Sequence, residues 1–391
     1  MIIGVVKETF PDERRVAVIP AAVPGLLKEG LELVIQAGAG QAAGFPDPEY
    51  QDKGVRVVAD RAEIFAQADG LLQVRTVGAN PEQGQPDLAL HRTGQVVIGC
   101  AEPLTPGEPI TTLAERGVAL FAMELMPRIT RAQSMDTLSS MASIAGYQAV
   151  LIAAEALPKM FPMMMTAAGT IKPARVFVMG AGVAGLQAIA TAKRLGAVVL
   201  AYDVRPAVKE QVESLGAKFV ELELEAGTSE DKGGYAKEMG EEFYRRQREK
   251  MLEVVADSDV VITTAAVPGK KAPILLTTEM VHAMKPGTVV VDMAAERGGN
   301  CELTRVGETV DEGGVMILGP VNLPATIPFH ASQMYSRNLQ TFLQQLISDG
   351  EPVLDLDDEV LRETLITRDG EVVHTRVRQL LGLAVNGQAG E

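Results

Sequence analysis

The chain has 391 residues, 47% of them hydrophobic, and a formal net charge of −15 at pH 7. A chain of this length and composition can bury large cores and is expected to be a soluble globular protein of two domains. The acidic balance argues against a nucleic-acid-binding surface, and the first residues lack the pattern of a signal peptide.

Cysteine and histidine are scarce. Cys100 and Cys301 have no paired spacing, and the four histidines are scattered. We therefore expect a reducing compartment and neither a disulfide framework nor a metal site. The longest apolar region, 149–168, is broken by Glu155, Lys159 and two prolines. Direct membrane insertion, which needs ~20 consecutive apolar residues, is not expected.

Short strand-like runs alternate with helical or turn stretches in the first third of the chain. Such alternation predicts a mostly parallel sheet with helices on both faces. The expected strands are Ile2–Val6, Leu33–Gln36, Val55–Val58, Gly70–Val74, Gln95–Cys100 and Val118–Met123. A long helical pattern from about Gln133 to Leu157 follows, and we expect it to bridge two lobes.

The stretch from Ala174 to Asp203 has the pattern of a dinucleotide-binding unit. A strand-like run, 174–179, leads directly into the glycine-rich segment Gly180–Gly185. An apolar helical pattern and a second strand-like run follow, and the second run stops at Asp203. Strand, glycine turn, helix and acidic residue together match the fingerprint of this unit.

Each fingerprint residue has a physical role. Gly180 permits the tight turn, Gly182 lets the backbone approach a pyrophosphate, and Gly185 lets the helix lie close to the strand. Asp203 is expected to bind an adenosine ribose and to repel the 2′-phosphate of NADP, although Arg205 weakens that preference. The alternative is a glycine turn that serves packing alone.

The second lobe continues beyond this unit. We expect helices at 207–215 and 241–256 and strands at 218–221, 260–264, 288–292 and 315–318, which makes six strands in all, the number of a full Rossmann fold.

The C-terminal region is expected to return to the first lobe. The helical region Leu323–Asp349 crosses back because the helix faces of that lobe still need covering, and the acidic segment Glu351–Glu363 and a short final helix complete it. We thus predict an α/β fold of two Rossmann-like, doubly wound parallel-sheet lobes with a cleft between them, joined by long helices. The N-terminal lobe spans 1–132 plus 325–391, and the NAD-binding lobe spans 133–324.

Two polar stretches are candidates for chemistry. In Met126–Ser140, an Arg, a Gln, an Asp and several hydroxyls can hold a carboxamide and a ribose by directed hydrogen bonds, and Arg128 can meet a phosphate. A helix N-cap formed by Ser134 or Asp136 explains the same residues equally well. The stretch Glu223–Gly240 has the composition of a long exposed loop, for which plain disorder is the alternative.

Three segments give the chain a resemblance to a known family. The run Pro127–Asp136, the segment Gly233–Phe243 and Gly298-Gly299-Asn300-Cys301 resemble the NAD(H)-binding alpha subunit, or domain I, of proton-translocating nicotinamide nucleotide transhydrogenase. The resemblance covers essentially the whole chain. It implies that the first run places its glutamine against the nicotinamide, and that Tyr235 lies on a mobile loop that closes over bound nucleotide.

The resemblance is carried over residue by residue. It implies catalytic roles for Gln133, Arg128, Asp136, Ser139 and Tyr235. The implied cofactor-binding positions are Arg128, Ile129, Gln133, Asp136 and Ser139 in the nicotinamide loop, Gly180, Ala181, Gly182, Val183, Gly185, Asp203, Val204 and Arg205 in and after the fingerprint, Gly234 and Tyr235 on the closing loop, and Gln247 and Ala266.

The resemblance also implies partners. NAD(H) is the expected cofactor of this chain, and NADP(H) is expected on a partner subunit. A homodimer is expected to dock on membrane-embedded transhydrogenase subunits that couple hydride transfer to proton translocation. The implied location is cytoplasmic, peripheral on the cytoplasmic face of the inner membrane. Hydride transfer between two nicotinamides needs no acid or base from the protein, because the chemistry belongs to the cofactors.

A related family is the alternative. Alanine dehydrogenases share the fingerprint and the opening pattern, here Gly4–Glu8 with Arg14–Ala17, but use a lysine and a histidine in the first lobe. This chain has Gln73-Val74-Arg75 and Gly99–Pro103 at the matching places. The sequence shows no group there that titrates near neutrality, as an amino-acid dehydrogenase requires. A non-catalytic NAD-sensing module is the third hypothesis.

Overall fold

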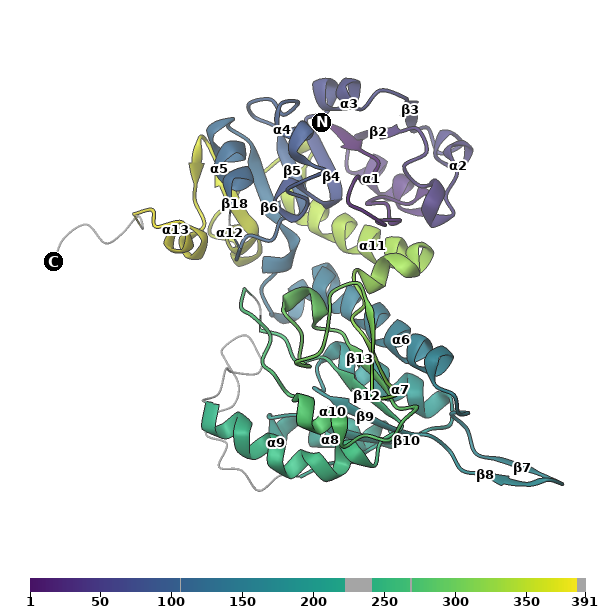
Figure 1. Ribbon diagram of the computed structural model, residues 1–391. Helices are drawn as coiled ribbons and strands as arrows, with labels where there is room; N and C mark the ends of the chain where they lie inside the picture. Colours follow the sequence, from purple (N-terminus) through teal and green to yellow (C-terminus); the bar gives the residue numbers. More distant parts are fainter. Residues whose placement is uncertain (106, 222–240, 268, 385–391) are drawn as a thin grey trace. The chain divides into compact units, whose positions relative to one another are not determined.

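The computed structural model (Figure 1) describes residues 1–105, 107–221, 241–267 and 269–384, without the side chains of 241–244 and 247. Two units make up the chain: the first unit is Met1–Met141 with Ala325–Glu391, and the second unit is Ala142–Pro324. The first change of unit falls inside helix α6 (Thr137–Ala156), nine residues beyond the expected boundary after residue 132.

The first unit is built on an eight-stranded sheet in the order β19-β18-β6-β5-β4-β1-β2-β3. The six strands β1 to β6 are parallel to one another, and their order, 6-5-4-1-2-3, is that of a doubly wound Rossmann sheet, whereas β18 joins β6 antiparallel. The strands are β1 (Ile2–Val5), β2 (Glu32–Gln36), β3 (Arg56–Val58), β4 (Gly70–Arg75), β5 (Val96–Cys100), β6 (Ala119–Ala122), β18 (Leu365–Arg368) and β19 (Glu371–Val372).

Helices cover both faces of this sheet. Side chains alternate along each strand, so Ile3 and Val5 of β1 enter one core and the neighbouring Ile2 and Val6 enter the core of the other face. The helices of the first unit are α1 (Val23–Lys28), α2 (Asp47–Gln51), α3 (Arg61–Gln67), α4 (Gln85–Leu88), α5 (Glu108–Glu115), α11 (Pro328–Leu346), α12 (Glu359–Thr364) and α13 (Thr375–Leu380).

Helix α11 supplies much of one core of the first unit. Its fully buried residues Tyr335, Leu339 and Phe342 pack in the same cluster as Ile3 and Val5 of β1. Its polar residues are tied to the N-terminal segment of the chain, since the Ser332 hydroxyl accepts from the Val16 amide and the Tyr335 hydroxyl donates to the Gln73 carbonyl at 2.8 Å. The N-terminal segment and the segment after residue 325 therefore share one core.

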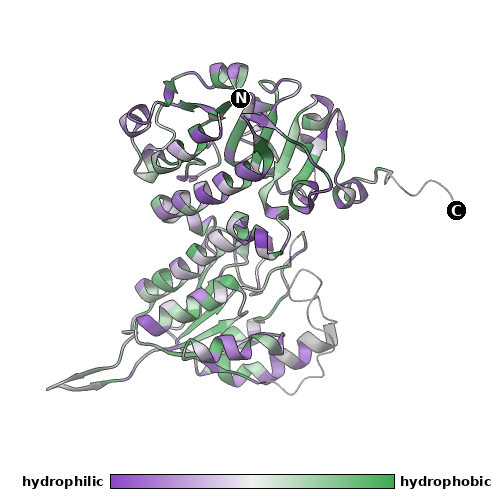
Figure 2. Cartoon of the chain, turned by 180° about the vertical axis from the view of Figure 1, so that it is seen from behind, coloured by the Kyte–Doolittle hydropathy of each residue, from purple (hydrophilic) through white to green (hydrophobic). Residues whose placement is uncertain are grey.

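The second unit repeats the architecture with a seven-stranded sheet in the order β11-β10-β9-β12-β13-β15-β14. Figure 2 shows the central strands of both sheets as hydrophobic, as sheets covered on both faces should be. The strands are β9 (Arg175–Met179), β10 (Val198–Tyr202), β11 (Lys218–Phe219), β12 (Val260–Thr263), β13 (Val289–Asp292), β14 (Thr309–Glu312) and β15 (Val315–Leu318), and the helices are α6, α7 (Val183–Arg194), α8 (Lys209–Ser214), α9 (Glu241–Ala256) and α10 (Thr278–His282).

Helix α6 is apolar along most of its length. By length and composition it is the one helix of the described residues that could cross a membrane, and 39% of its apolar window is buried within the structure. Ala149, Val150 and Ala153 are fully buried in the core that also contains Val176 and Val178 of β9. Its composition is therefore also that of a helix packed on a sheet.

Several hairpins correct the expected secondary structure. The segment after residue 351 contains the pair β18–β19, and β14 pairs with β15 as a seventh strand in the second unit. Both connections are two-residue turns, Asp369-Gly370 and Gly313-Gly314, with positive φ at each residue, as tight hairpins require. Two small hairpins, β7 (Met164–Thr166) with β8 (Gly169–Ile171) and β16 (Ile347–Ser348) with β17 (Glu351–Pro352), were also not expected.

The expected helix from Gln133 to Leu157 is also corrected. A 3-10 helix, η5 (Thr130–Met135), precedes α6, which begins only at Thr137. The break lies at Asp136, whose carboxylate accepts the Ser139 amide at 2.9 Å and so caps α6.

Glu124, which follows β6, is a partly buried acid whose carboxyl group lies inside the fold and bridges two strand ends. Its Oε1 accepts from the amides of Ala101 and Glu102, just beyond β5, at 2.7 and 2.6 Å. Burial, with repulsion from Glu102, raises the pKa of Glu124 to about 7. The folded protein therefore holds this proton over a pH range in which the unfolded chain has lost it.

We predict that Glu124→Gln flattens the dependence of stability on pH. In the wild type, stability falls as pH rises from about 5 to 8, because the unfolded chain ionises Glu124 near 4.5 and the folded chain near 7. Glutamine keeps the acceptor oxygen without the ionisation, so the variant should gain about 1–3 kcal/mol relative to wild type across that range. Urea unfolding between pH 5 and 8 measures this, with the exposed Glu115→Gln as control. Parallel profiles for wild type and Glu124→Gln would contradict it.

Candidate functional site

The glycine turn of the second unit connects β9 to α7. Gly180 has a φ of +103°, which only glycine adopts without strain, and its amide donates to the Tyr202 carbonyl of β10. A Cβ on Gly185 would stand 1.8 Å from the Gly180 carbonyl oxygen, so helix and strand can approach this closely only with glycine. Both positions are constrained by the fold itself.

Gly182 is different. It has a φ of −74°, which any residue adopts, and the nearest atom to a Cβ placed there is the Arg205 Nη2 at 4.0 Å. The space in front of Gly182 is therefore open. The first turn of α7, which begins at the next residue, Val183, carries no acidic side chain, so its amide groups can meet an anion.

Asp203 lies immediately after β10 and beside the glycine turn. Its Oδ2 accepts from the Ala181 amide at 2.7 Å, and its Oδ1 accepts from the amide and the Nε of Arg205 at 2.8 and 2.9 Å. Both side chains are largely buried, 5% exposed for Asp203 and 13% for Arg205. Asp203 thus orders the turn and also holds Arg205. The neighbouring Val204 packs against the core that contains Met179 and Tyr202.

The loop after β12 is tied to the same turn. The Thr264 hydroxyl donates to the Gly180 carbonyl at 3.0 Å. The next residue, Ala265, exchanges two hydrogen bonds with the buried side chain of Asn300, at 3.0 and 2.8 Å. Ala266 follows at the carboxyl end of β12, where loops of a doubly wound sheet line a ligand crevice.

Asp292, at the end of β13, fixes Asn300 in turn. This fully buried carboxylate accepts from the amides of Asn300 and Cys301 and from the hydroxyls of Thr263 and Thr304, at 2.7 to 3.0 Å. In the sequence, the segment Gly298–Cys301 contributes only to the family resemblance, and no role was expected for it. The feature visible in the sequence was a pair of adjacent glycines directly before Asn300. In the structure both glycines have positive φ.

The nicotinamide-loop candidates lie in the first unit. Ala132 and Met135 of η5 are buried three residues apart, as the 3-10 repeat dictates, and they enter the core that contains α11. Gln133 and Arg128 are exposed, and Ile129 is partly buried against that core. The loop therefore presents Gln133 outward from an anchored base.

Asp136 and Ser139 are brought together. The Ser139 amide and hydroxyl donate to the two oxygens of Asp136 at 2.9 and 2.6 Å. The N-cap alternative thus holds for Asp136, and Ser134 does not serve as the cap. Gly234 and Tyr235 lie outside the described residues, as does the side chain of Gln247.

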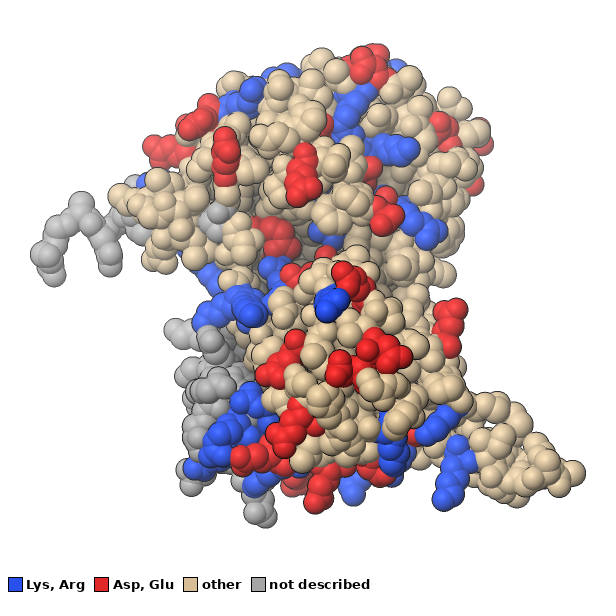
Figure 3. All heavy atoms as spheres, viewed as in Figure 1, with Lys and Arg blue, Asp and Glu red and all other residues tan. Residues whose placement is uncertain are grey.

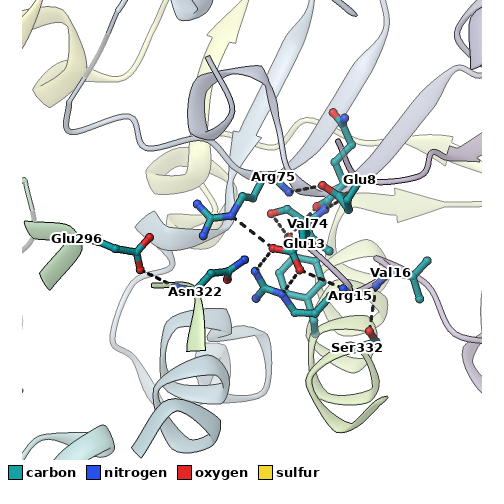
Figure 4. A network of polar contacts seen from close by, with 11 residues as sticks. Glu8, Glu13, Arg15, Val16, Val74, Arg75, Glu296, Asn322 and Ser332 are labelled. Carbon is teal, nitrogen blue, oxygen red and sulfur yellow. Dashed lines mark hydrogen bonds and ion pairs between the residues drawn. The ribbon is translucent and has the colours of Figure 1, made fainter. Parts of the chain in front are cut away.

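A cluster of charged residues lies at the carboxyl edge of the sheet of the first unit (Figure 4). Glu13 binds Arg15 through two contacts of 2.7 and 2.6 Å, and its Oε2 lies 3.5 Å from the Arg75 Nε. Glu8 accepts from the amides of Val74 and Arg75 at the end of β4. The cluster lies where the strand order reverses, between β1 and β4. Here the carboxylates of Glu8 and Glu13 already accept from nearby backbone amides and arginines.

Two acids at the carboxyl ends of these strands have raised pKa values. Burial, with repulsion from Glu13, raises the pKa of Glu8 to about 7, and Glu124 has a similarly raised pKa. Neither acid lies at the two places, 73–75 and 99–103, where the sequence shows no group that titrates near neutrality. Cys100, in the same region, has its pKa raised by burial, which makes its thiol unreactive. Among the described residues, no group of three acidic, His or Cys side chains could hold a metal ion.

Comparisons with known proteins agree with this architecture. Family models described as alanine dehydrogenase/PNT match the chain, the N-terminal domain at residues 4–145 and the C-terminal domain at residues 149–375. A chain of NAD(P) transhydrogenase subunit alpha from Rhodospirillum rubrum is 47% identical over 96% of this chain and 98% of its own length. Alanine dehydrogenase of Bacillus subtilis is 26% identical over 98% of this chain and 95% of its own length.

A solved structure is similarly close. The crystal structure of transhydrogenase from Sinorhizobium meliloti has 47% sequence identity and a TM-score of 0.84, covering 95% of this chain and 100% of its own. The resemblance inferred from the sequence is thereby confirmed: the chain belongs to the alanine dehydrogenase/PNT family, in which it is much more similar to transhydrogenase alpha subunits than to alanine dehydrogenase.

Proposed function

We propose that this chain is the NAD(H)-binding subunit of a proton-translocating transhydrogenase, which exchanges hydride between NAD(H) bound here and NADP(H) bound on a partner subunit. The observation that carries this proposal is the combination of 47% identity to a transhydrogenase alpha subunit with a complete fingerprint in the second unit. Membrane subunits would couple the exchange to proton translocation, and the chain would lie at the cytoplasmic face of the inner membrane through them.

The residues of the second unit fit a dinucleotide. The open space at Gly182 suits a pyrophosphate against the N-terminus of α7, and the Asp203 carboxylate suits an adenosine ribose. When bound, the nicotinamide supplies the hydride chemistry. The chain's own residues bind, orient and exclude water: Gln133 offers both a donor and an acceptor to a carboxamide, and Arg128 offers a charged donor.

Alanine dehydrogenase activity is the second candidate, favoured by the shared family and by the two acids that titrate near neutrality. Three observations oppose it. Identity to alanine dehydrogenase is 26%, the expected lysine and histidine are absent, and both arginines at the carboxyl edge, Arg15 and Arg75, already form ion pairs with Glu13. Glu8 is also engaged through both oxygens by backbone amides.

A second copy of this chain is proposed to cover the β7–β8 hairpin. This hairpin projects from the rest of the second unit (Figure 1), and its tip carries no charged side chain (Figure 3). Met163, Met165 and Ile171 are 59, 75 and 43% exposed. A lone two-stranded hairpin is marginal in water, so an apolar one needs a partner surface.

We predict that two glycine substitutions affect different properties, one the affinity for NADH and the other the stability of the fold. Gly182→Ala should raise the NADH dissociation constant by about 10-fold or more and leave the thermal midpoint unchanged, because its Cβ enters only the open space proposed for the pyrophosphate. Gly185→Ala should destabilise the fold without nucleotide by about 1–3 kcal/mol or more, because its Cβ meets a backbone carbonyl. NADH fluorescence titration and thermal unfolding measure both, and wild-type affinity in Gly182→Ala would oppose the assigned site.

We predict that purified chain oxidises NADH only when an NADP-binding partner domain loaded with NADP⁺ is added. In that mixture Gln133→Asn should slow transfer in the saturated complex by about 10- to 100-fold, since a shorter amide misplaces the ring, and should change NADH affinity little. Ser134→Ala is the matched loop control. Turnover with pyruvate and ammonia alone would instead establish a dehydrogenase, and NADH binding without turnover in either mixture would indicate a sensing module.

We predict that Met165→Asp weakens self-association by about 10-fold or more, because a charge would be buried against the second copy. Sedimentation velocity across a concentration series measures this, with Val306→Asp, an exposed apolar residue outside the hairpin, as control. A wild-type chain that sediments as a monomer at micromolar concentration would refute the dimer.

A further inference from the structure

The loop that bears Gln133 is held by the segment of the chain that follows residue 325. Arg131 and Ser134, which lie on either side of Gln133, each meet a partner more than 200 positions away in sequence. Both partners belong to the first unit, as does the loop.

The first anchor is an ion pair between Arg131 and Asp358. The Arg131 Nη1 and Nη2 donate to the two oxygens of Asp358 at 2.8 and 3.0 Å, a bidentate geometry that fixes direction as well as distance. The guanidinium beside Asp358 lowers the pKa of that carboxyl, so the pair stays charged at neutral pH.

Asp358 is itself held rigidly. It is the N-cap of α12, where its Oδ1 accepts from the amides of Val360 and Leu361 at 2.7 and 3.3 Å. Its Oδ2 also accepts from the Gln345 Nε2 of α11 at 3.1 Å. Arg131 is therefore attached to a carboxylate that two helices keep in place.

The second anchor is Asn338 of α11. Its Nδ2 donates to the Ser134 carbonyl at 2.8 Å, and its side chain is 5% exposed. Ala132 and Met135, buried against the same core, complete the base of the loop. Gln133 stands on the exposed side of a turn that is fixed on both flanks.

We propose that Asp358 and Asn338 are positioning residues for hydride transfer, which act through Arg131 and Ser134 to hold Gln133 in place; this inference rests on the proposed role of Gln133 at the nicotinamide. Neither residue needs to touch the nucleotide. A displacement of about 1 Å far from the chemistry can slow a reaction about 100-fold, so anchors of a reactive loop matter more for rate than for affinity.

The ion pair is poorly suited to a purely stabilising role. Arg131 is 45% exposed, and exposed pairs contribute little to folding stability. A bidentate ion pair that contributes little to folding stability still fixes the orientation of its partners. A loop that must hold Gln133 in place requires this property.

The test uses three variants of the full chain in the reconstituted transfer assay. Asp358→Asn keeps the capping oxygen of α12, since Asn caps as well as Asp, but loses the bidentate ion pair. Asn338→Ala removes the second anchor. Gln344→Ala is the control, because this exposed residue of the same helix α11 donates to Glu29 and not to Asp358.

We expect each anchor variant to slow transfer at saturating nucleotide by about 3- to 10-fold, and the double variant by about 10- to 100-fold. NADH affinity and the thermal midpoint should stay near wild type, and the control Gln344→Ala should behave as wild type. Hydrogen exchange of the amides of residues 131–136, measured without nucleotide, should accelerate in both anchor variants.

Two outcomes separate this inference from the proposed function. Unchanged exchange, or wild-type transfer in folded Asp358→Asn and Asn338→Ala when Gln133→Asn is slow, would overturn the anchors and leave the function standing. Accelerated exchange with wild-type transfer in every variant, Gln133→Asn included, would overturn the proposed role of the loop, and the positioning inference would fall with it.

Discussion

The carbonyl oxygen of Gly180 is held from two directions, and the candidate site of the second unit depends on it. Helix α7 approaches it so closely that Gly185 admits no side chain, and Thr264 donates a hydrogen bond to it from the loop after β12. That loop is in turn held by Asn300, which Asp292 fixes. A buried carboxylate at the end of β13 is thus connected, through the side chains of Asn300 and Thr264, to the turn after β9.

The same use of carboxylates recurs at the sheet of the first unit. Glu8 and Glu124 each accept two backbone amides at or just beyond the ends of neighbouring strands, and Asp292 accepts backbone amides of the segment that follows β13 in the second unit. Amides at the carboxyl edge of a parallel sheet are free to bind ligands. In the first unit side chains of the protein satisfy several of them, whereas the space at Gly182 in the second unit is open. This contrast accounts for a nucleotide fingerprint in the second unit alone, although both units contain a doubly wound sheet.

The parallel strands of both sheets could be predicted from the sequence because most of them are apolar runs between glycine and proline turns. The fingerprint could be read residue by residue because each glycine answers a separate steric demand. The two-residue turn at Asp369-Gly370 was visible as an Asp-Gly pair, but the strands beside it, such as β19, are too short to show an apolar pattern. The roles of Asn300 and Asp358 could not be predicted, because their partners are distant in sequence and become neighbours only through the fold.

The discontinuity of the first unit also has a consequence for synthesis on the ribosome. The second unit is an uninterrupted segment and is complete once residue 324 has emerged. The first 141 residues must wait for α11, because Tyr335, Leu339 and Phe342 fill the core against which β1 packs. We therefore expect the N-terminal strands to remain without a finished core, and the Gln133 loop without its anchors, until the last segment of the chain is made. The second unit in sequence is the first that can finish folding.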